Sequence, residues 1–316
     1  MENSKKRSPL EYVGLYVIGI VVGAANVIPG VSGGTMAFIL GIYEELLDSI
    51  RKFASGSTVK MLAAFKLKEA YRTLPWRFLF VLLLGIVSAS LLLAKPLKWM
   101  LENQVSFILA FFFGLVLASI ITVLLRLSKF SWKLIPALAA GTAAGWLIVG
   151  LTAVQSPPDA WWYLVLCGAV AICAMILPGI SGSFILMLMG RYKDVLAAID
   201  GVVHRSNFGG SLLTLALFVV GVVLGLASFA RLLSWMFKRW RDLTISVLAG
   251  FMVGSLRKIW PWKAGDVLEN GNVLPQVDGC FWIAVALAVT GFALVVAIEL
   301  VARYFERHRN GIEKAE

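Results

Sequence analysis

The chain has 316 residues, of which 59% are hydrophobic and 15% are charged, and its mean hydropathy is +0.85. A soluble domain is about 45–50% apolar and about 25% charged, so this composition excludes an ordinary soluble protein and indicates a polytopic membrane protein. The net charge of +11 would point to nucleic acid on a soluble protein. Here it indicates basic loops that set topology and face anionic membrane lipids, and we expect no nucleic-acid partner.

Apolar segments follow one another along the whole chain. They do not alternate as barrel strands do, and a backbone in lipid must satisfy its own hydrogen bonds, so we predict α-helices. The first two segments enter and return either as two spans or as one re-entrant hairpin. The predicted fold is an all-α polytopic membrane protein with a single transmembrane domain over 1–316. The segments lie at 12–28, 31–47, 77–94, 105–125, 134–151, 161–177, 179–190, 211–230, 243–257 and 280–302.

Glycine and proline, which break helices, interrupt the first apolar stretch and one later stretch. Residues 27–43 read VIPGVSGGTMAFILGIY and residues 176–192 read ILPGISGSFILMLMGRY, so the order Pro-Gly-x-Ser-Gly returns at an offset of 149. A further match at an offset of 136 pairs 85–100 with 221–236. The chain is therefore predicted to contain two tandem copies, at about 10–152 and 159–305.

Lysine and arginine are distributed unevenly over the connecting loops. If the N-terminus is cytoplasmic, 21 of the 29 Lys and Arg fall on the cytoplasmic side and 8 on the other side. This positive-inside bias places both termini in the cytoplasm, with 303–316 as a cytoplasmic tail. Each copy then crosses the membrane an odd number of times, so the two copies are inverted. Inverted repeats with interrupted helices are typical of secondary transporters, whose substrates bind between such breaks near the midplane.

The two interruptions have the composition of an anion site. A helix N-terminus carries about half a positive charge and free N–H donors, and Ser32 and Ser181 stand at the N-cap positions. Small residues that merely allow close helix packing are the alternative, but the matched second copy favours a site for a phosphate. The candidate binding residues are Pro29, Gly30, Ser32, Gly33, Gly34 and Thr35 with Pro178, Gly179, Ser181, Gly182 and Ser183.

Four polar residues in apolar segments are weaker candidates, because charge is expensive there. Lys95 and Arg231 are repeat-related and are expected at helix ends on opposite faces, where they either snorkel to the interface or attract phosphate at each mouth. Glu299 either binds a coupling cation or packs against Arg303. Asn26 either caps a helix or contacts the ligand. We expect no catalytic residue, metal site or cofactor.

The two motifs in their context are recognisable. NVIPGVSGGTMAFILGIYEELL and ILPGISGSFILMLMGRYKDVL together resemble the bacterial polyprenyl-phosphate (undecaprenyl-phosphate) translocase family, over essentially the whole chain. The resemblance implies an inner-membrane flippase that returns undecaprenyl phosphate, the lipid carrier of cell-wall synthesis, from the outer to the inner leaflet. It assigns the family motif to the eleven candidate binding residues and leaves open whether H⁺ or Na⁺ is coupled. The second copy departs from the first by having Ser183 where Gly34 stands.

Two alternatives compete with that interpretation. Membrane undecaprenyl-pyrophosphate phosphatases share inverted repeats and a similar motif, but in those enzymes an Arg follows the Ser and stabilises the transferring phosphoryl group. Here Gly33 and Gly182 occupy that position, so we expect no phosphatase activity. A small-anion secondary transporter using the same helix N-termini is the other alternative.

Overall fold

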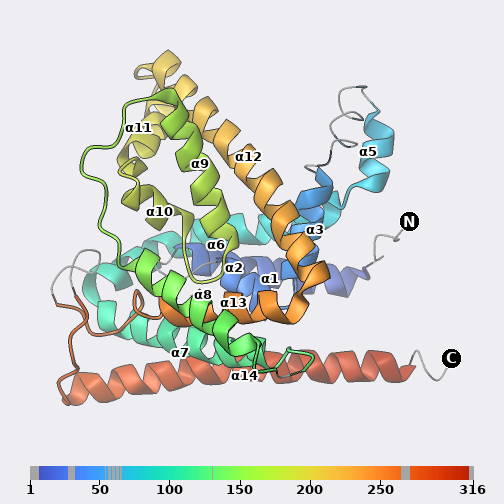
Figure 1. The fold of residues 1–316 in the computed structure, drawn as a ribbon, viewed down its shortest axis with the longest axis vertical. Helices are drawn as coiled ribbons and strands as arrows, with labels where there is room; N and C mark the ends of the chain where they lie inside the picture. The colour runs from blue at the N-terminus through green and yellow to red at the C-terminus, as the bar shows by residue number, and fades with distance from the viewer. Residues whose placement is uncertain are drawn as a thin grey trace. The chain divides into compact units, whose positions relative to one another are not determined.

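The computed structural model describes residues 7–27, 33–53, 55, 58, 61, 64, 66–129, 131–264 and 271–312. Within these ranges the regular structure is helical, with one isolated bridge between Lys263 and Asn272, so the all-α prediction is confirmed for them. Figure 1 shows the helices: α1 (Pro9–Val27), α2 (Gly33–Ile39), α3 (Tyr43–Phe53), α5 (Leu67–Thr73), α6 (Trp76–Asn103), α7 (Val105–Leu124), α8 (Leu134–Val149), α9 (Trp161–Ile176), α10 (Gly182–Leu188), α11 (Tyr192–Val203), α12 (Phe208–Arg239), α13 (Arg241–Ser255) and α14 (Gly279–Ile312).

Several of these helices are long and apolar enough to cross a membrane. α1, α6, α7, α12 and α14 each contain an apolar stretch of at least 18 residues, and α8 and α9 are shorter apolar helices. A helix needs about 20 apolar residues to span the hydrocarbon core, so the chain is a multi-pass membrane protein.

The predicted segment 31–47 is not one helix, because it divides into α2 and α3 at Gly41. The N–H of Ile42 donates to Ala37 O at 3.0 Å, and Gly41 has a φ of +74°, a conformation that glycine adopts without a Cβ clash. Gly190, its counterpart in the second copy, has a φ of +73° and separates α10 from α11 in the same way. Each short broken helix is therefore closed at its C-terminal end by a glycine at the matching position.

Lys95 and Arg231 do not lie at helix ends, which corrects the prediction. α6 continues beyond Lys95 to Asn103, and α12 continues beyond Arg231 to Arg239. The residues that follow each cation are mostly leucine, methionine, lysine and arginine, which favour helix, so the helix outlasts the apolar run. Both side chains are exposed.

The chain forms two compact units that do not coincide with the two predicted copies. The first unit comprises Met1–Ala94 and Gly150–Thr244, and the second comprises Lys95–Val149 and Ile245–Glu316. Each unit therefore combines a part of the first copy with the matching part of the second. The boundaries fall inside α6, next to Pro96, and inside α13.

In the first unit, the same close helix crossing occurs once in each copy. A Cβ added to Gly19 of α1 would lie within 3.0 Å of Leu82 O on α6. A Cβ added to Gly168 of α9 would lie equally close to Phe218 O on α12. Gly19 and Gly168 are related by the offset of 149, and Leu82 and Phe218 by the offset of 136. The crossing of α1 with α6 thus recurs residue for residue as the crossing of α9 with α12.

In the second unit, the repeated crossing joins helices of different copies. A Cβ on Gly114 of α7 would meet Ala288 O on α14, and a Cβ on Gly250 of α13 would meet Leu138 O on α8, both well inside 3.0 Å. Gly114 and Gly250 are repeat-related, and Leu138 and Ala288 are related by an offset of 150. The last two helices of the first copy, α7 and α8, therefore pack against α14 and α13, the last two helices of the second copy. The orientation of the copies in the membrane stays a prediction.

Candidate substrate site

The second motif forms a capped helix break in the first unit. α9 ends at Ile176, and Ser181 then accepts a hydrogen bond from Phe184 N at 3.2 Å as the N-cap of α10. Between them Gly179 has a φ of +99°, which glycine tolerates and other residues rarely adopt. The hydroxyl oxygens of Ser181 and Ser183 are 3.3 Å apart. The predicted N-cap is confirmed here, and it brings two hydroxyls to the start of a short helix.

The first motif is described only in part. Pro29, Gly30 and Ser32 lie outside the described residues, whereas Gly33 begins α2 with Gly34 and Thr35 behind it. Asn26 Oδ1 accepts a hydrogen bond from Gly33 N at 2.9 Å. Asn26 therefore caps α2 from the last turn of α1, which is one of the two roles that the sequence left open. A side chain at Gly33 would collide with that amide.

Asn26 makes the two breaks chemically unequal. Its counterpart at the offset of 149 is Met175, which has no oxygen to accept a bond from α10. Ser183 in place of Gly34 adds a hydroxyl to the second break instead. The first break thus carries an amide from the preceding helix, and the second carries an additional serine.

A buried tyrosine ties the two broken segments together. Tyr43, the first residue of α3, donates from its hydroxyl to Ile176 O at 3.0 Å, where α9 ends. Its ring packs against Phe38 and Phe237 at centroid distances of 5.0 and 5.9 Å. The last carbonyls of a helix have no intrahelical partner, so this bond satisfies one that the break exposes. The two motifs therefore lie in one unit, joined through the end of α9.

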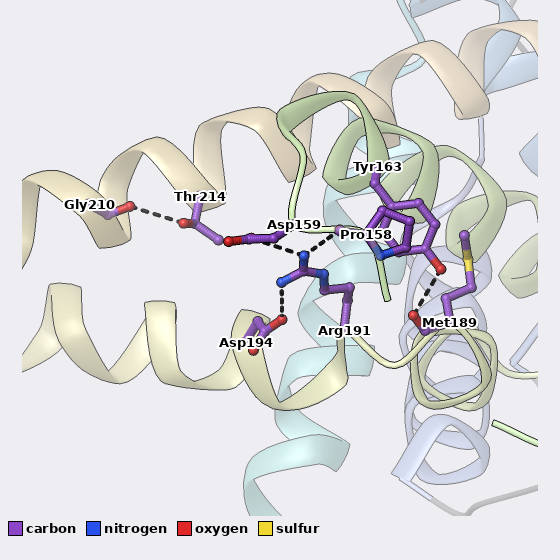
Figure 2. Close-up of polar contacts among 8 residues, drawn as sticks. All are labelled: Pro158, Asp159, Tyr163, Met189, Arg191, Asp194, Gly210 and Thr214. Atoms are coloured by element: carbon purple, nitrogen blue, oxygen red, sulfur yellow. Dashed lines mark hydrogen bonds and ion pairs between the residues drawn. The ribbon is translucent and has the colours of Figure 1, made fainter. Parts of the chain in front are cut away.

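Arg191 fastens the loop before α9 onto the start of α11, as Figure 2 shows. Its guanidinium donates to Asp194 Oδ2 at 2.7 Å, to Asp159 Oδ1 at 3.1 Å and to Pro158 O. The Arg191 side chain is 12% exposed, whereas the carboxylates of Asp159 and Asp194 reach solvent. Nearby, the Tyr163 hydroxyl donates to Met189 O at 3.0 Å. The 152–160 loop is thereby held against the end of α10.

An ion pair at the corresponding place in the first copy does the same with different residues. Arg7 binds both carboxylate oxygens of Glu45, with 2.8 Å between Nη1 and Oε1. Glu45 and Asp194 are related by the offset of 149. Hydrogen bonding to Glu45 raises the pKa of the Arg7 guanidinium above its usual value. In the first copy a carboxylate on α3 thus binds the segment before α1 directly, whereas in the second copy Arg191 bridges Asp194 of α11 to the segment before α9.

The remaining charged candidate, Glu299, lies in the second unit and is paired. Arg126 Nη2 donates to Glu299 Oε2 at 3.0 Å, and the glutamate is 9% exposed. The sequence proposed Arg303 as its structural partner, but that side chain lies outside those described. A carboxylate in an ion pair is less available to a coupling cation than a solitary one.

Sequence reasoning missed Tyr43, Arg191 and the partner of Glu299. Arg191 and Asp194 have the i,i+3 spacing of a helical ion pair, but nothing in the local sequence indicates Asp159 as a further partner. The only available signal was the recurrence of an acidic residue at 45 and 194.

Comparisons with known proteins agree with the motif. The family model described as undecaprenyl phosphate translocase-like matches residues 22–274. The chain belongs to this family. It is 42% identical over 272 residues to a polyprenyl-phosphate transporter of Vibrio cholerae, covering 85% of each chain. It is 31% identical over 261 residues to a polyprenyl-phosphate transporter of Staphylococcus aureus, covering 77% of this chain and 84% of the relative.

Membership of this family makes the chain a transporter and not an enzyme. The phosphatase alternative is therefore excluded by relationship as well as by the absent arginine. No solved structure matches the chain.

Proposed function

We propose that this chain transports polyprenyl phosphate, returning undecaprenyl phosphate from the outer to the inner leaflet of the bacterial cytoplasmic membrane for reuse in cell-wall and glycan precursor synthesis. The observation that carries the proposal is the pair of helix breaks at matching positions, one capped by Asn26 and one by Ser181. Both lie in one compact unit of a chain whose curated relatives are named polyprenyl-phosphate transporters.

The phosphate head group would bind at the starts of α2 and α10. Moving such an anion through hydrocarbon without partners costs many kcal/mol, so the protein must replace its water. The first N–H groups of each helix have no intrahelical acceptor, and glycines leave them accessible. Ser181 Oγ accepts from Phe184 N, so its own hydrogen can be donated to a ligand or to Ser183 Oγ at 3.3 Å. The proposed ligands are Pro29, Gly30, Ser32, Gly33, Gly34, Thr35, Pro178, Gly179, Ser181, Gly182 and Ser183.

Transport would follow from movements around these motifs that open them to each leaflet in turn, as in other transporters with inverted repeats. Lys95 and Arg231 would attract the phosphate on either side. Glu299 is the candidate for a coupled H⁺ or Na⁺, which would reach the carboxylate only when the ion pair with Arg126 opens.

Reconstitution in liposomes tests the proposal. Purified protein is expected to equilibrate a labelled polyprenyl monophosphate between leaflets, and Ser32→Ala combined with Ser181→Ala should abolish this without unfolding the protein. Ser228→Ala is the matched control, because that hydroxyl bonds to Leu224 O of its own helix at 2.7 Å. Unchanged transport by the double variant would refute the site. Flux of chloride or inorganic phosphate without lipid transport would favour the small-anion alternative.

A further inference from the structure

A groove in the second unit is lined by apolar atoms. It lies between α7 and α14, which run side by side in Figure 1, and has a volume of about 300 Å³. Trp260, Pro261 and Trp262, in the loop after α13, close one end. Val289, one of its lining residues, is 61% exposed, so the groove opens on the surface of α14, a helix long and apolar enough to span a membrane. Such a groove accepts an apolar chain from the bilayer.

The loop that closes the groove is held in a defined conformation. Trp260 Nε1 donates to Val273 O at 3.0 Å, and Val273 N donates to Trp262 O at 3.1 Å. Trp260 packs on Phe113 of α7 and Trp262 stacks on Phe281 of α14, with ring centroids 5.6 Å apart in each case. The end wall of the groove is therefore built from both helices and the loop together. Tryptophan at this level is typical of the interface between hydrocarbon and head groups.

Three cations gather in the same loop. Arg257 and Lys258 precede the two tryptophans and Lys263 follows directly after Trp262. Lys263 Nζ donates to Asn272 Oδ1 at 2.6 Å and to Arg257 O at 3.3 Å, and both acceptors are neutral oxygens. Arg257 stacks over the ring of Trp146 at 4.7 Å.

The electrostatics of this cluster favour an added anion. Burial, with repulsion from Lys258 and Arg257, lowers the pKa of Lys263 to about 8. Burial also lowers the pKa of Lys258 below its usual value. Asp266 and Glu269 lie outside the described residues, and Asp278 is engaged as the N-cap of α14 by Phe281 N at 2.8 Å. A phosphate beside these cations would relieve their mutual repulsion and favour the charged form of Lys263.

We propose that this groove and cation cluster form a docking site for polyprenyl phosphate, with the prenyl chain between α7 and α14 and the phosphate beside Arg257, Lys258 and Lys263. The inference rests on the proposed function and deepens it, because it adds a recruitment site in the second unit to the site at the broken helices of the first unit. The predicted topology puts this loop on the outer face, where three of the face's 8 Lys and Arg are concentrated within seven residues. A carrier lipid arriving in the outer leaflet would meet the cations at head-group level.

Photocrosslinking in nanodiscs of phosphatidylcholine tests the site. The probe is a short polyprenyl monophosphate bearing a diazirine on its chain, and labelled peptides are expected from α7, α14 and the 256–263 loop. Val289→Trp fills the mouth of the groove and should lower labelling there roughly tenfold, as should Lys258→Gln combined with Lys263→Gln. The controls are Leu294→Trp on α14, which does not line the groove, and Lys193→Gln, an exposed lysine on the same predicted face. Thermal unfolding of each variant separates lost binding from misfolding.

The possible outcomes separate this inference from the proposed function. Unchanged labelling in both the groove and charge variants overturns the docking site, and transport that still depends on Ser32 and Ser181 would leave the proposed function standing. Equal displacement of the probe by phosphatidylglycerol and by unlabelled polyprenyl phosphate also overturns it, because the groove would then be a general anionic-lipid site. Selective labelling in a protein that moves no lipid between leaflets would support the docking site and refute the proposed function.

Discussion

Gly114→Ala tests the closest helix crossing in the second unit. A Cβ at this position would fall well inside 3.0 Å of Ala288 O, and the neighbouring atoms are also backbone. Backbone cannot rotate away as a side chain can, so α7 and α14 must separate to accommodate the methyl group. The repeat-related substitution Gly250→Ala forces the same separation between α13 and α8.

The magnitude follows from two opposing terms. Overpacking a tight contact costs about 1–3 kcal/mol, and the upper end applies because both walls are rigid helix. Replacing glycine by alanine inside a helix raises the free energy of unfolding by about 1 kcal/mol, because alanine favours the helical conformation. The net loss is therefore about 2 kcal/mol for Gly114→Ala. Gly14→Ala in α1 is the matched control, since nothing lies within 4 Å of its Cβ, and only the favourable term remains.

Thermal unfolding of the purified variants in one detergent measures the difference. Gly114→Ala and Gly250→Ala are expected to lower the midpoint by several degrees, since about 1 kcal/mol shifts it by roughly 2–4 °C in a large domain. Gly14→Ala should leave the midpoint unchanged or raise it. If Gly114→Ala proved as stable as Gly14→Ala, the close approach of α7 and α14, and the repeated crossing deduced from it, would be wrong.

Three further predictions concern charged groups. Glu299→Gln should lower the free energy of unfolding by about 1–3 kcal/mol, because it removes the carboxylate that pairs with Arg126. The double variant Arg126→Leu with Glu299→Leu should recover most of that stability. If Glu299→Gln abolished transport without changing stability, a role in ion coupling would be indicated instead. Arg191→Lys should speed proteolysis of the 152–160 loop several-fold, because one ammonium cannot span the acceptors that the guanidinium fork reaches; an unchanged cleavage rate would contradict this. The pKa of Lys263 is about 8 in the folded chain, against 10.5 for an ordinary lysine. Between these pH values the unfolded state binds more protons than the folded state, so the free energy of unfolding should rise with pH across that window. The rise should vanish in Lys263→Gln.

Local chemistry explains which features were readable from the sequence. Proline, glycine and serine act on their own few residues, so the break near 178 and the N-cap at Ser181 were predictable without tertiary contacts. The lengths of the helices were less predictable, because α6 and α12 extend beyond the apolar runs that the sequence shows. The division of 31–47 at Gly41 is not evident from the sequence, because a glycine within an apolar run is compatible with one continuous helix as well as with a helix end.

Partners distant in the chain were not readable. Arg126 and Glu299 are 173 residues apart, and Tyr43 and Ile176 are 133 apart. Nothing in the local sequence of either member identifies the other, because ion pairs and buried hydroxyls form with whatever the packing brings near.

The sequence alone determined that the chain is a helical membrane protein, and it predicted two related copies with a helix break in each. Hydropathy, charge bias and helix-breaking residues act locally and recur visibly at fixed offsets. Only the tertiary structure decided that the compact units cut across the copies, with the last helices of each exchanged. The pairing of these helices depends on close contact between glycines of one helix and backbone carbonyls of another. The sequence does not reveal the pairing, because small residues permit close packing without specifying the partner helix.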